Sequence, residues 1–257
     1  MAQSSMWLSA VLVFLTVTII ILFILNFRFL LYPAVPSLNP LAHARQVRLR
    51  GNTLFISDLH LKSTEPFKYA KDLRSFIETT QVSNLIVNGD LFYSPKDARR
   101  VLGSSPDAAS ILGKLGLDGL PLNLFWVLGS PAHDPPNPLN DQSDPGTLKV
   151  LGKCALIDFG RMQVMAYHGH DLSLKGAFGH AWNRFISKLS LERMWKRVAK
   201  VDGSIWALFG HTHLPGVDSR HRVANSGGWQ RVPFVNPTKT GLLISDKNTA
   251  PELVSIA

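Results

Sequence analysis

The stretch TLFISDLH, residues 53–60, decides the fold class. Its first half, Thr53 to Ile56, is a short apolar run, which predicts a buried strand. Its second half ends in Asp58 and His60, two side chains that bind metal ions. In open α/β sheets, ligands bind in the crevice beyond the carboxyl ends of the strands. The stretch therefore predicts such a strand and a metal site at its end.

The same arrangement recurs four more times along the chain. Further apolar runs end in Asp90, in the loop 127–134, in His168-Gly169-His170, and in His211-Thr212-His213. We expect these side chains to meet in one crevice although they are distant in sequence. Asp58 and His60 are two residues apart, as are His211 and His213, so on an extended backbone each pair would share a face.

Strand-like and helical patterns alternate, which is typical of an α/β fold. We expect strands over 53–56, 84–87, 122–128, 155–158, 162–167, 205–209 and 241–245, and helices near 66–80 and 107–115. Between Lys175 and Lys200, apolar and basic residues interleave at helical spacing, which predicts a helical basic insertion. This insertion either packs its apolar side on the domain, or covers a site, or rests on anionic lipid headgroups.

The amino-terminal segment predicts a membrane anchor. Residues 7–26 are uncharged and mostly apolar, and about twenty helical residues cross the hydrocarbon layer. Basic residues follow this segment and none precedes it, which places the remainder of the chain in the cytoplasm. We therefore divide the chain into a single-pass transmembrane anchor over 1–32, a proline-containing linker over 33–45, and one domain over 46–257.

The composition indicates the chemical class of binding partner but does not identify the partner. The chain has 257 residues and a formal net charge of +9, which favours anionic partners such as phosphates and acidic lipids. Nucleic acid is a poorer expectation, because a membrane anchor restricts access to DNA. The single cysteine, Cys154, excludes an intramolecular disulfide.

The motifs, taken in order, resemble those of the calcineurin-like metallophosphoesterase family. That family's pattern is Asp-x-His, Gly-Asp, Gly-Asn-His-Asp, a later His-Gly or Gly-His pair, and Gly-His-x-His, and the match runs from Leu54 to Asn225. The resemblance implies a four-layer α/β/β/α sandwich that holds two divalent metal ions. Mixed imidazole and carboxylate ligands without thiolates suit Mn, Zn or Fe.

The resemblance also implies a role for each residue. One ion would be held by Asp58, His60 and His213, the second by His168 and His211, and both by a bridging Asp90. His133 would be the general acid, with Asp134 fixing its orientation. His170 would either orient His168 or line the site.

The loop VLGSPAHD, residues 127–134, departs from the family pattern. Ser-Pro-Ala stands where the family has a single Asn, whose amide oxygen would coordinate the second ion. Ser130, or a backbone carbonyl of the Pro131 turn, is the candidate replacement. The affinity of the second site should fall, although three protein ligands can still hold a catalytic metal.

The expected function is a membrane-anchored hydrolase. It would cleave a phosphomonoester, phosphodiester or pyrophosphate by attack of a metal-activated hydroxide. The basic insertion is also similar in placement to the cap of the UDP-2,3-diacylglucosamine pyrophosphohydrolases, which would make the substrate a lipid-linked nucleotide and give Arg184 and Lys188 a substrate-binding role. The alternative is a catalytically impaired member that binds phospholipid or protein at the membrane surface.

Overall fold

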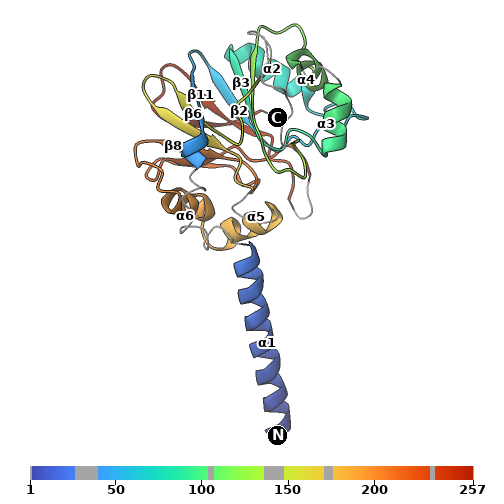
Figure 1. Cartoon of the computed structure of the whole chain (residues 1–257), viewed down its shortest axis with the longest axis vertical. Helices are drawn as coiled ribbons and strands as arrows, with labels where there is room; N and C mark the ends of the chain where they lie inside the picture. Colours follow the sequence, from blue (N-terminus) through green and yellow to red (C-terminus); the bar gives the residue numbers. More distant parts are fainter. Residues whose placement is uncertain are drawn as a thin grey trace.

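The computed structural model describes residues 2–26, 40–103, 107–135, 148–170, 176–231 and 235–256. Figure 1 shows a mixed α/β domain and one helix, α1 (Ala2–Asn26), extending from it. The large apolar side chains described in α1 are exposed, among them Trp7 and Phe14. Within the described residues, no helix combines the length and the apolar character that a membrane span requires.

Two six-stranded sheets form the centre of the domain. We call them the β2 sheet and the β7 sheet, each after one of its strands. The β2 sheet has the order β12-β11-β2-β3-β4-β5, and the β7 sheet has the order β1-β6-β7-β8-β10-β9. The strands of the first are β2 (Thr53–Ile56), β3 (Asn84–Asn88), β4 (Asn123–Val127), β5 (Leu148–Val150), β11 (Thr240–Ile244) and β12 (Glu252–Ser255). Those of the second are β1 (Arg45–Arg48), β6 (Cys154–Asp158), β7 (Gln163–Tyr167), β8 (Trp206–Phe209), β9 (Gly216–Asp218) and β10 (Val223–Asn225).

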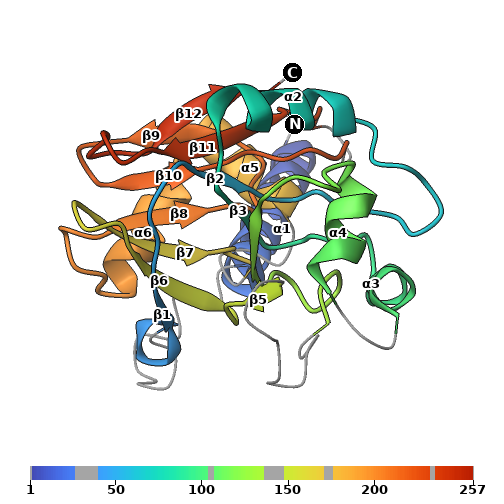
Figure 2. The same cartoon turned by 90° about the horizontal axis from the view of Figure 1, so that it is seen from above.

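The sheets pack face to face, and helices cover both outer faces (Figure 2). The core between the sheets joins Phe55 and Ile86 of one to Val164 and Leu208 of the other. On the outer face of the β2 sheet lie α2 (Ala70–Thr80), α3 (Pro95–Leu102) and α4 (Ala108–Leu115). On the outer face of the β7 sheet lie α5 (Gly176–Phe185) and α6 (Ser190–Val198). This is the α/β/β/α layer order that the resemblance implies.

Parallel pairing directs several strand ends to one edge of the domain. In the β2 sheet, β2, β3 and β4 run parallel, with Ile56 paired to Val87 and Asn88 paired to Val127. In the β7 sheet, β7 and β8 run parallel. The five apolar runs that end in metal-binding residues are these five strands. Because parallel strands end on the same side of a sheet, their following loops are neighbours.

The structure differs from the sequence expectations at several elements. Helix α3 and strands β1, β5, β9, β10 and β12 were not expected; the three-residue strands are too short to show a hydrophobic period. The 3-10 helix at Pro40–His43 and Arg45, which pairs with Ala155, fall within the range expected as linker. Part of the expected linker, residues 33–39, lies outside the described residues.

Candidate metal centre

All six predicted ligands meet at this edge of the domain. Three overlapping groups have ligand atoms within 4.8 Å of one another: Asp58 with His60 and His213, His60 with Asp90 and His133, and Asp90 with His168 and His211. The first and third groups are the two ligand sets that the resemblance implies. Asp90, which follows β3, is shared between the second and third groups, and His60 is shared between the first and second.

The centre lies on the junction between the two sheets. Asp58 and His60 follow β2 and Asp90 follows β3, whereas His168 follows β7 and His211 and His213 follow β8. Asp58 connects the two sides directly. Its Oδ2 accepts a 3.0 Å hydrogen bond from the backbone N–H of His211, and its Oδ1 lies 3.1 Å from Nε2 of His213. Asn88 adds further links, because its amide donates to the carbonyls of Tyr167 and Leu208.

The ring of His168 is fixed by a backbone carbonyl. Its Nδ1 lies 2.8 Å from the carbonyl oxygen of Asn88, and since a carbonyl can only accept, Nδ1 carries the hydrogen. Its Nε2 then faces the carboxylates, 3.2 Å from Asp90 and 3.9 Å from Asp58. In metal sites, the ring nitrogen that does not bind the ion commonly donates to a carbonyl, and this bond fixes the orientation of the imidazole.

The ligands do not lie on extended backbone. Asp58, His60, Asp90, His211 and His213 all have positive φ, between 45° and 60°, and they are five of the ten non-glycine residues with positive φ in the described part of the chain. The expectation that Asp58 with His60, and His211 with His213, share a face of an extended backbone is therefore wrong. Each strand ends before its ligands, and the left-handed turns aim the side chains inward. Such conformations cost roughly 1–3 kcal/mol each and cluster at functional sites.

Glycines allow this close approach of loops. A Cβ on Gly89 would overlap the ring of His168, and one on Gly129 would overlap the backbone of Asp90. A Cβ on Gly210 would lie 2.8 Å from Oδ2 of Asp58. Gly89 and Gly210 each precede a ligand, and Gly129 lies in the loop that packs on Asp90, so the absence of a side chain at these positions is a packing requirement of the centre.

Burial and neighbouring charges shift the ionisation of these groups. Burial opposes the charge on Asp58, but the imidazoles of His213 and His168 bring the pKa of its carboxyl well below the usual range. Asp90 behaves likewise, mainly through His168. Burial lowers the pKa of His60 to about 4, whereas Asp90 and Asp58 overcome burial and raise the pKa of His168 to about 10. The carboxylates are thus charged, and His168 carries the compensating proton.

The donor set fits divalent cations. His60 Nδ1 and His213 Nδ1 are buried and have no hydrogen-bond partner among the described residues, whereas Asp58 Oδ1 and His168 Nε2 meet only other members of the centre. Buried polar atoms without partners are costly and call for an explanation such as an ion. Imidazole and carboxylate ligands favour Mn, Zn or Fe, whereas the single thiol, on Cys154, is buried in a different cluster behind the β7 sheet.

Metal binding should release protons. Imidazole binds a cation in its neutral form, and the pKa of His168 is raised to about 10, so the metal-free protein holds this proton at pH 7. Adding Mn²⁺ or Zn²⁺ to metal-free protein in weak buffer should release about one proton per chain, and affinity should fall as the pH is lowered. His168→Asn should abolish this release while sparing the group of Asp58, His60 and His213. Binding without proton release would contradict the assignment of His168.

The loop after β4 is organised around Asp134. This buried carboxylate accepts hydrogen bonds from the backbone N–H groups of Asp90, Leu91, Phe92 and Gly129 and from the indole of Trp126. Burial and the charge of Asp90 raise its pKa to about 7, and the backbone N–H donors act in the opposite direction. The expected role of Asp134, to orient His133, is therefore corrected: it fixes the loop against the turn that carries Asp90.

His133 is oriented by a different group. Its Nδ1 lies 2.8 Å from the carbonyl oxygen of Tyr93, which directs Nε2 to within 3.9 Å of Asp90 Oδ2. Its ring packs 4.4 Å from that of His60, and its side chain is 30% exposed, unlike the buried ligands. The two extra residues of the loop therefore leave His133 beside the centre.

The other predicted site residues lie around this core. Ser130 donates its N–H to Asp90 Oδ1, but its hydroxyl accepts from Ala132 within the loop. His170 lies beside His168, with ring centroids 6.1 Å apart, and is outside the three ligand groups of the described residues. Arg184 and Lys188 are exposed on the insertion. Their substrate-binding role stays a prediction.

A buried acid on the insertion was missed by sequence reasoning. Glu192 of α6 is fully buried and accepts hydrogen bonds from Thr212 (2.7 Å), Asn183 (2.7 Å) and Asn225 (3.0 Å). Thr212 stands between the ligands His211 and His213. Glu192 is the single acid in a segment that reads as basic and amphipathic, so no sequence pattern gave a reason to select it. Its bond to Thr212 connects the insertion to the ligand loop.

The contact between the insertion and the ligand loop can be tested by exchanging the donor and the acceptor of the hydrogen bond between Asn183 and Glu192. The Oδ1 of Asn183 accepts from Leu191 N–H, so this amide cannot turn, and Glu192→Gln should place two N–H donors face to face and cost about 1–3 kcal/mol. Adding Asn183→Asp should restore the bond between these two side chains with its direction reversed, while Leu191, Thr212 and Asn225 donate as before. We expect thermal stability and Co²⁺ affinity to fall in each single variant and to recover together in the double variant. Additive losses would contradict the network.

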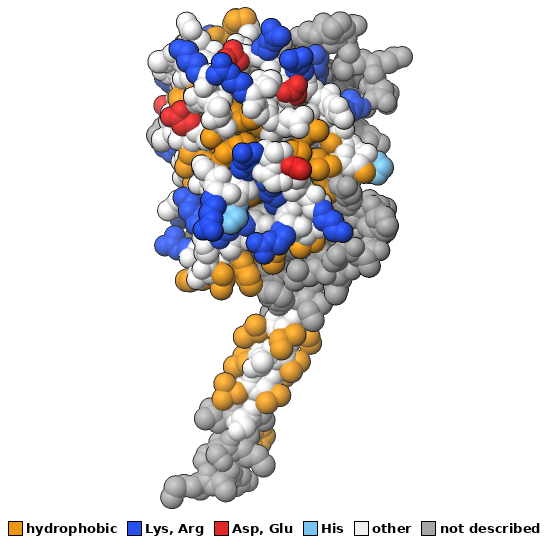
Figure 3. Space-filling model, turned by 90° about the vertical axis from the view of Figure 1, so that its left-hand side faces the viewer, with side chains coloured by type: hydrophobic (Ala, Val, Ile, Leu, Met, Phe, Trp, Pro, Cys, Tyr) orange, Lys and Arg blue, Asp and Glu red, His pale blue; other side chains and the backbone are white. Residues whose placement is uncertain are grey.

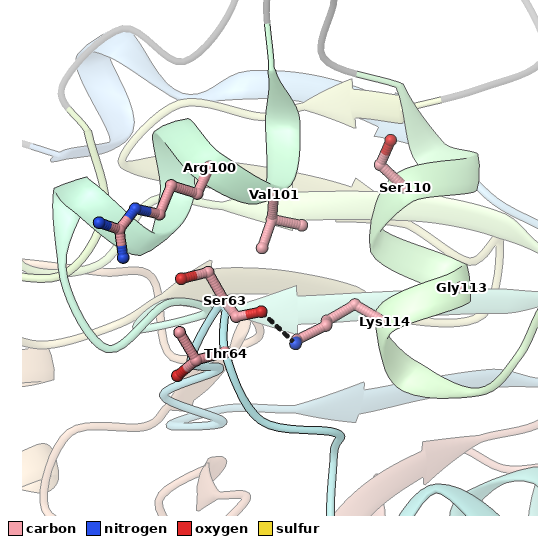
Figure 4. Close-up of a pocket in the computed structure, with 7 residues that line it drawn as sticks. All are labelled: Ser63, Thr64, Arg100, Val101, Ser110, Gly113 and Lys114. Carbon is pink, nitrogen blue, oxygen red and sulfur yellow. Dashed lines mark hydrogen bonds between the residues drawn. The ribbon is translucent and has the colours of Figure 1, made fainter.

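A separate cavity of about 660 Å³ lies beside α3 and α4 (Figure 4). Arg100 and Lys114 contribute positive charge to its lining. However, Lys114 donates to the carbonyl of Ser63, and the Ser63 hydroxyl and N–H both bond to Asp97. These polar groups brace the 61–64 loop against the helices, and we assign no ligand to this cavity.

Comparison with known proteins gives distant structural likenesses. No family model and no curated protein sequence matches the chain. Among solved structures, it is similar to Vps29 from Entamoeba histolytica complexed with zinc (16% identity, TM-score 0.40, covering 80% of this chain and 99% of that one). It is also similar to YfcE, a phosphoesterase from E. coli (15%, 0.40, 80% and 100%), and to an archaeal phosphodiesterase (12%, 0.44, 79% and 98%). At this distance, the function has to be argued from the residues of the centre.

Proposed function

We propose that this chain is a metal-dependent phosphoesterase, a hydrolase of phosphomonoesters, phosphodiesters or pyrophosphates. One observation carries the proposal: three ligand groups overlap through Asp90 and His60 at the junction of two sheets. Overlapping groups of this kind suit two cations that share a carboxylate. When bound, such a pair polarises a phosphoryl group and supplies a hydroxide nucleophile near neutral pH.

The chain's own residues divide the remaining work. Asp58, His60 and His213 would hold one cation, His168 and His211 the other, with Asp90 between them. His133 is partly exposed and its Nε2 faces the centre, so it can protonate the leaving oxygen of the substrate. The Tyr93 carbonyl keeps the hydrogen on Nδ1 of the neutral ring, so that only Nε2 exchanges protons.

The proposal is tested with the full chain in detergent. Metal-free protein should be inactive on 4-nitrophenyl phosphate and bis(4-nitrophenyl) phosphate, and reloading with Mn²⁺ or Zn²⁺ should give turnover on at least one. His133→Ala should lower kcat by about 10²–10⁴ with the metal content unchanged. Because this side chain lies at the surface, unfolding free energy should change by less than about 0.5 kcal/mol.

Asp134→Asn provides the matched contrast in the same loop. It removes an acceptor from buried N–H groups, so the unfolding free energy should fall by about 3 kcal/mol, and activity should fall through the loop rather than through proton transfer. Equal effects of the two variants on stability would contradict the division of roles. A fully loaded protein that turns over neither esters nor pyrophosphate would exclude the hydrolase.

The alternative is an impaired member that binds phospholipid or protein. The loop after β4 favours it, because the Ser130 hydroxyl accepts a hydrogen bond within its own turn and the group of Asp90, His168 and His211 keeps only three protein ligands. Such a protein would hold fewer than two ions per chain, and His133→Ala would leave its cellular role intact. Metal analysis of the purified chain therefore separates the two functions.

We also propose that the chain is anchored to a membrane, with the domain on the cytoplasmic side. The uncharged segment 7–26 and the exposed apolar side chains of α1 support this. On the domain, Phe185 and Ile186 at the end of α5 are 82% and 63% exposed, and Arg184 and Lys188 flank them. The face in Figure 3 carries more Lys and Arg than Asp and Glu, which suits an anionic lipid surface.

Membrane anchoring is tested by alkaline extraction and topology reporters. The full chain should stay with the membrane at high pH, and a reporter at the carboxyl terminus should be cytoplasmic. Val13→Arg together with Ile20→Arg should release the chain, because each charge costs about 2.5–3.5 kcal/mol within a span. Phe14→Leu is the matched apolar control and should remain anchored. Extraction of the unchanged chain would contradict the anchor.

A further inference from the structure

A second recess opens directly beside the metal centre. It has a volume of about 230 Å³, and its lining comes from residues 59–62 and 65–69, from Trp229 to Arg231, and from Pro237. His60, a member of two ligand groups, is part of this lining. A substrate whose phosphoryl group occupies the centre would therefore place its next atoms in this recess.

The recess has an aromatic wall. Phe67 and Tyr69 are half-buried, and their rings lie 5.7 Å and 6.0 Å from the ring of Trp229. Trp229 is held by an N–H···O bond from its indole to the carbonyl of Thr240. Its backbone N–H donates to the backbone carbonyl of Asp58. The wall is thus fixed to the same turn that supplies a metal ligand, so its position relative to the centre is set by the fold.

The rim of the recess is positively charged. Lys62, Lys68 and Arg231 belong to the lining, against one acid, Glu65. Glu65 bonds to Lys62 at 2.9 Å, which leaves an excess of positive charge on the other two. Lys62 also lies 5.4 Å from the ring of Tyr93, the residue whose carbonyl orients His133. The excess positive charge of the lining therefore lies on Lys68 and Arg231.

Size restricts what this recess can take. Sites for whole drug-sized ligands measure about 300–1,000 Å³, so 230 Å³ suits one ring rather than an entire lipid or a nucleotide sugar. An aromatic wall favours a flat ring, and an exposed cation at the rim favours an anionic substituent.

We propose that this recess binds the organic group attached to the reacting phosphoryl group, and that this group is a ring that bears a second negative charge. The inference rests on the proposed function and names the substrate class of the same site. Phe67 and Tyr69 contact the ring, and Arg231 pairs with the second anion. Both recognise the bound substrate and do not take part in bond cleavage.

Three probes test this with the metal-loaded full chain: 4-carboxyphenyl phosphate, phenyl phosphate and glycerol 2-phosphate. Arg231→Met keeps an apolar side chain of similar length, and it should raise KM for 4-carboxyphenyl phosphate about tenfold while leaving phenyl phosphate unchanged. Phe67→Leu should raise KM for both aryl substrates and not for glycerol 2-phosphate. Arg161→Met, in the exposed turn between β6 and β7 at the far ends of these strands, is the charge control and should change nothing.

The outcomes separate this inference from the proposed function. If the probes are turned over and the KM values of Arg231→Met and Phe67→Leu are unchanged, the recess does not bind the organic group of the substrate. The proposed phosphoesterase function is then unaffected. If no probe is turned over, calorimetric titration with the phosphonate analogue of 4-carboxyphenyl phosphate gives the same comparison through Kd. Tenfold weaker binding to Arg231→Met supports the recess, and equal Kd values overturn it.

Discussion

The centre depends on the carboxylate of Asp58. One of its oxygens is bonded to the backbone of His211 and the other faces the ring of His213, so a single side chain at the end of β2 fixes the loop at the end of β8. This carboxylate is fully buried, and burying a charge without compensation would cost several kcal/mol. Imidazoles compensate it in the metal-free chain, and cations would do so in the loaded protein. Stability and function are therefore linked at this position.

The same requirement explains the unusual backbone of the centre. Ligands from four strand ends can approach one another only if the backbone turns sharply after each strand. The left-handed conformations at Asp90 and His60 and the missing side chains at Gly89 and Gly129 satisfy this need. Asp134 holds the resulting turns by accepting N–H groups from two of them. The hydrogen bonds that Asp134 accepts, together with packing of the core, thus offset the backbone strain at the ligands.

Much of this could be predicted from sequence, because strand ends and metal-binding residues are local signals. The order Asp58, His60, Asp90, His168, His211 and His213 identified the ligands that the structure brings together. The role of Asp134 could not be predicted, since its partners lie on a different loop. Glu192 was also missed: a single acid in a basic amphipathic segment shows no pattern, and its importance arises only when α6 packs beside Thr212. The positive φ values leave no trace in residue type beyond the tolerance of Asp and His for that region.

The division of the ligands between sheets bears on how the chain acquires its cations during folding. Asp58, His60 and Asp90 belong to loops of the β2 sheet, and His168, His211 and His213 belong to loops of the β7 sheet. A partly folded chain with one finished sheet therefore offers only part of each proposed ligand set: two of three side chains in one set and one of three in the other. If the centre holds cations as proposed, their tight binding would follow docking of the two sheets, and bound metal would report that this assembly step is complete.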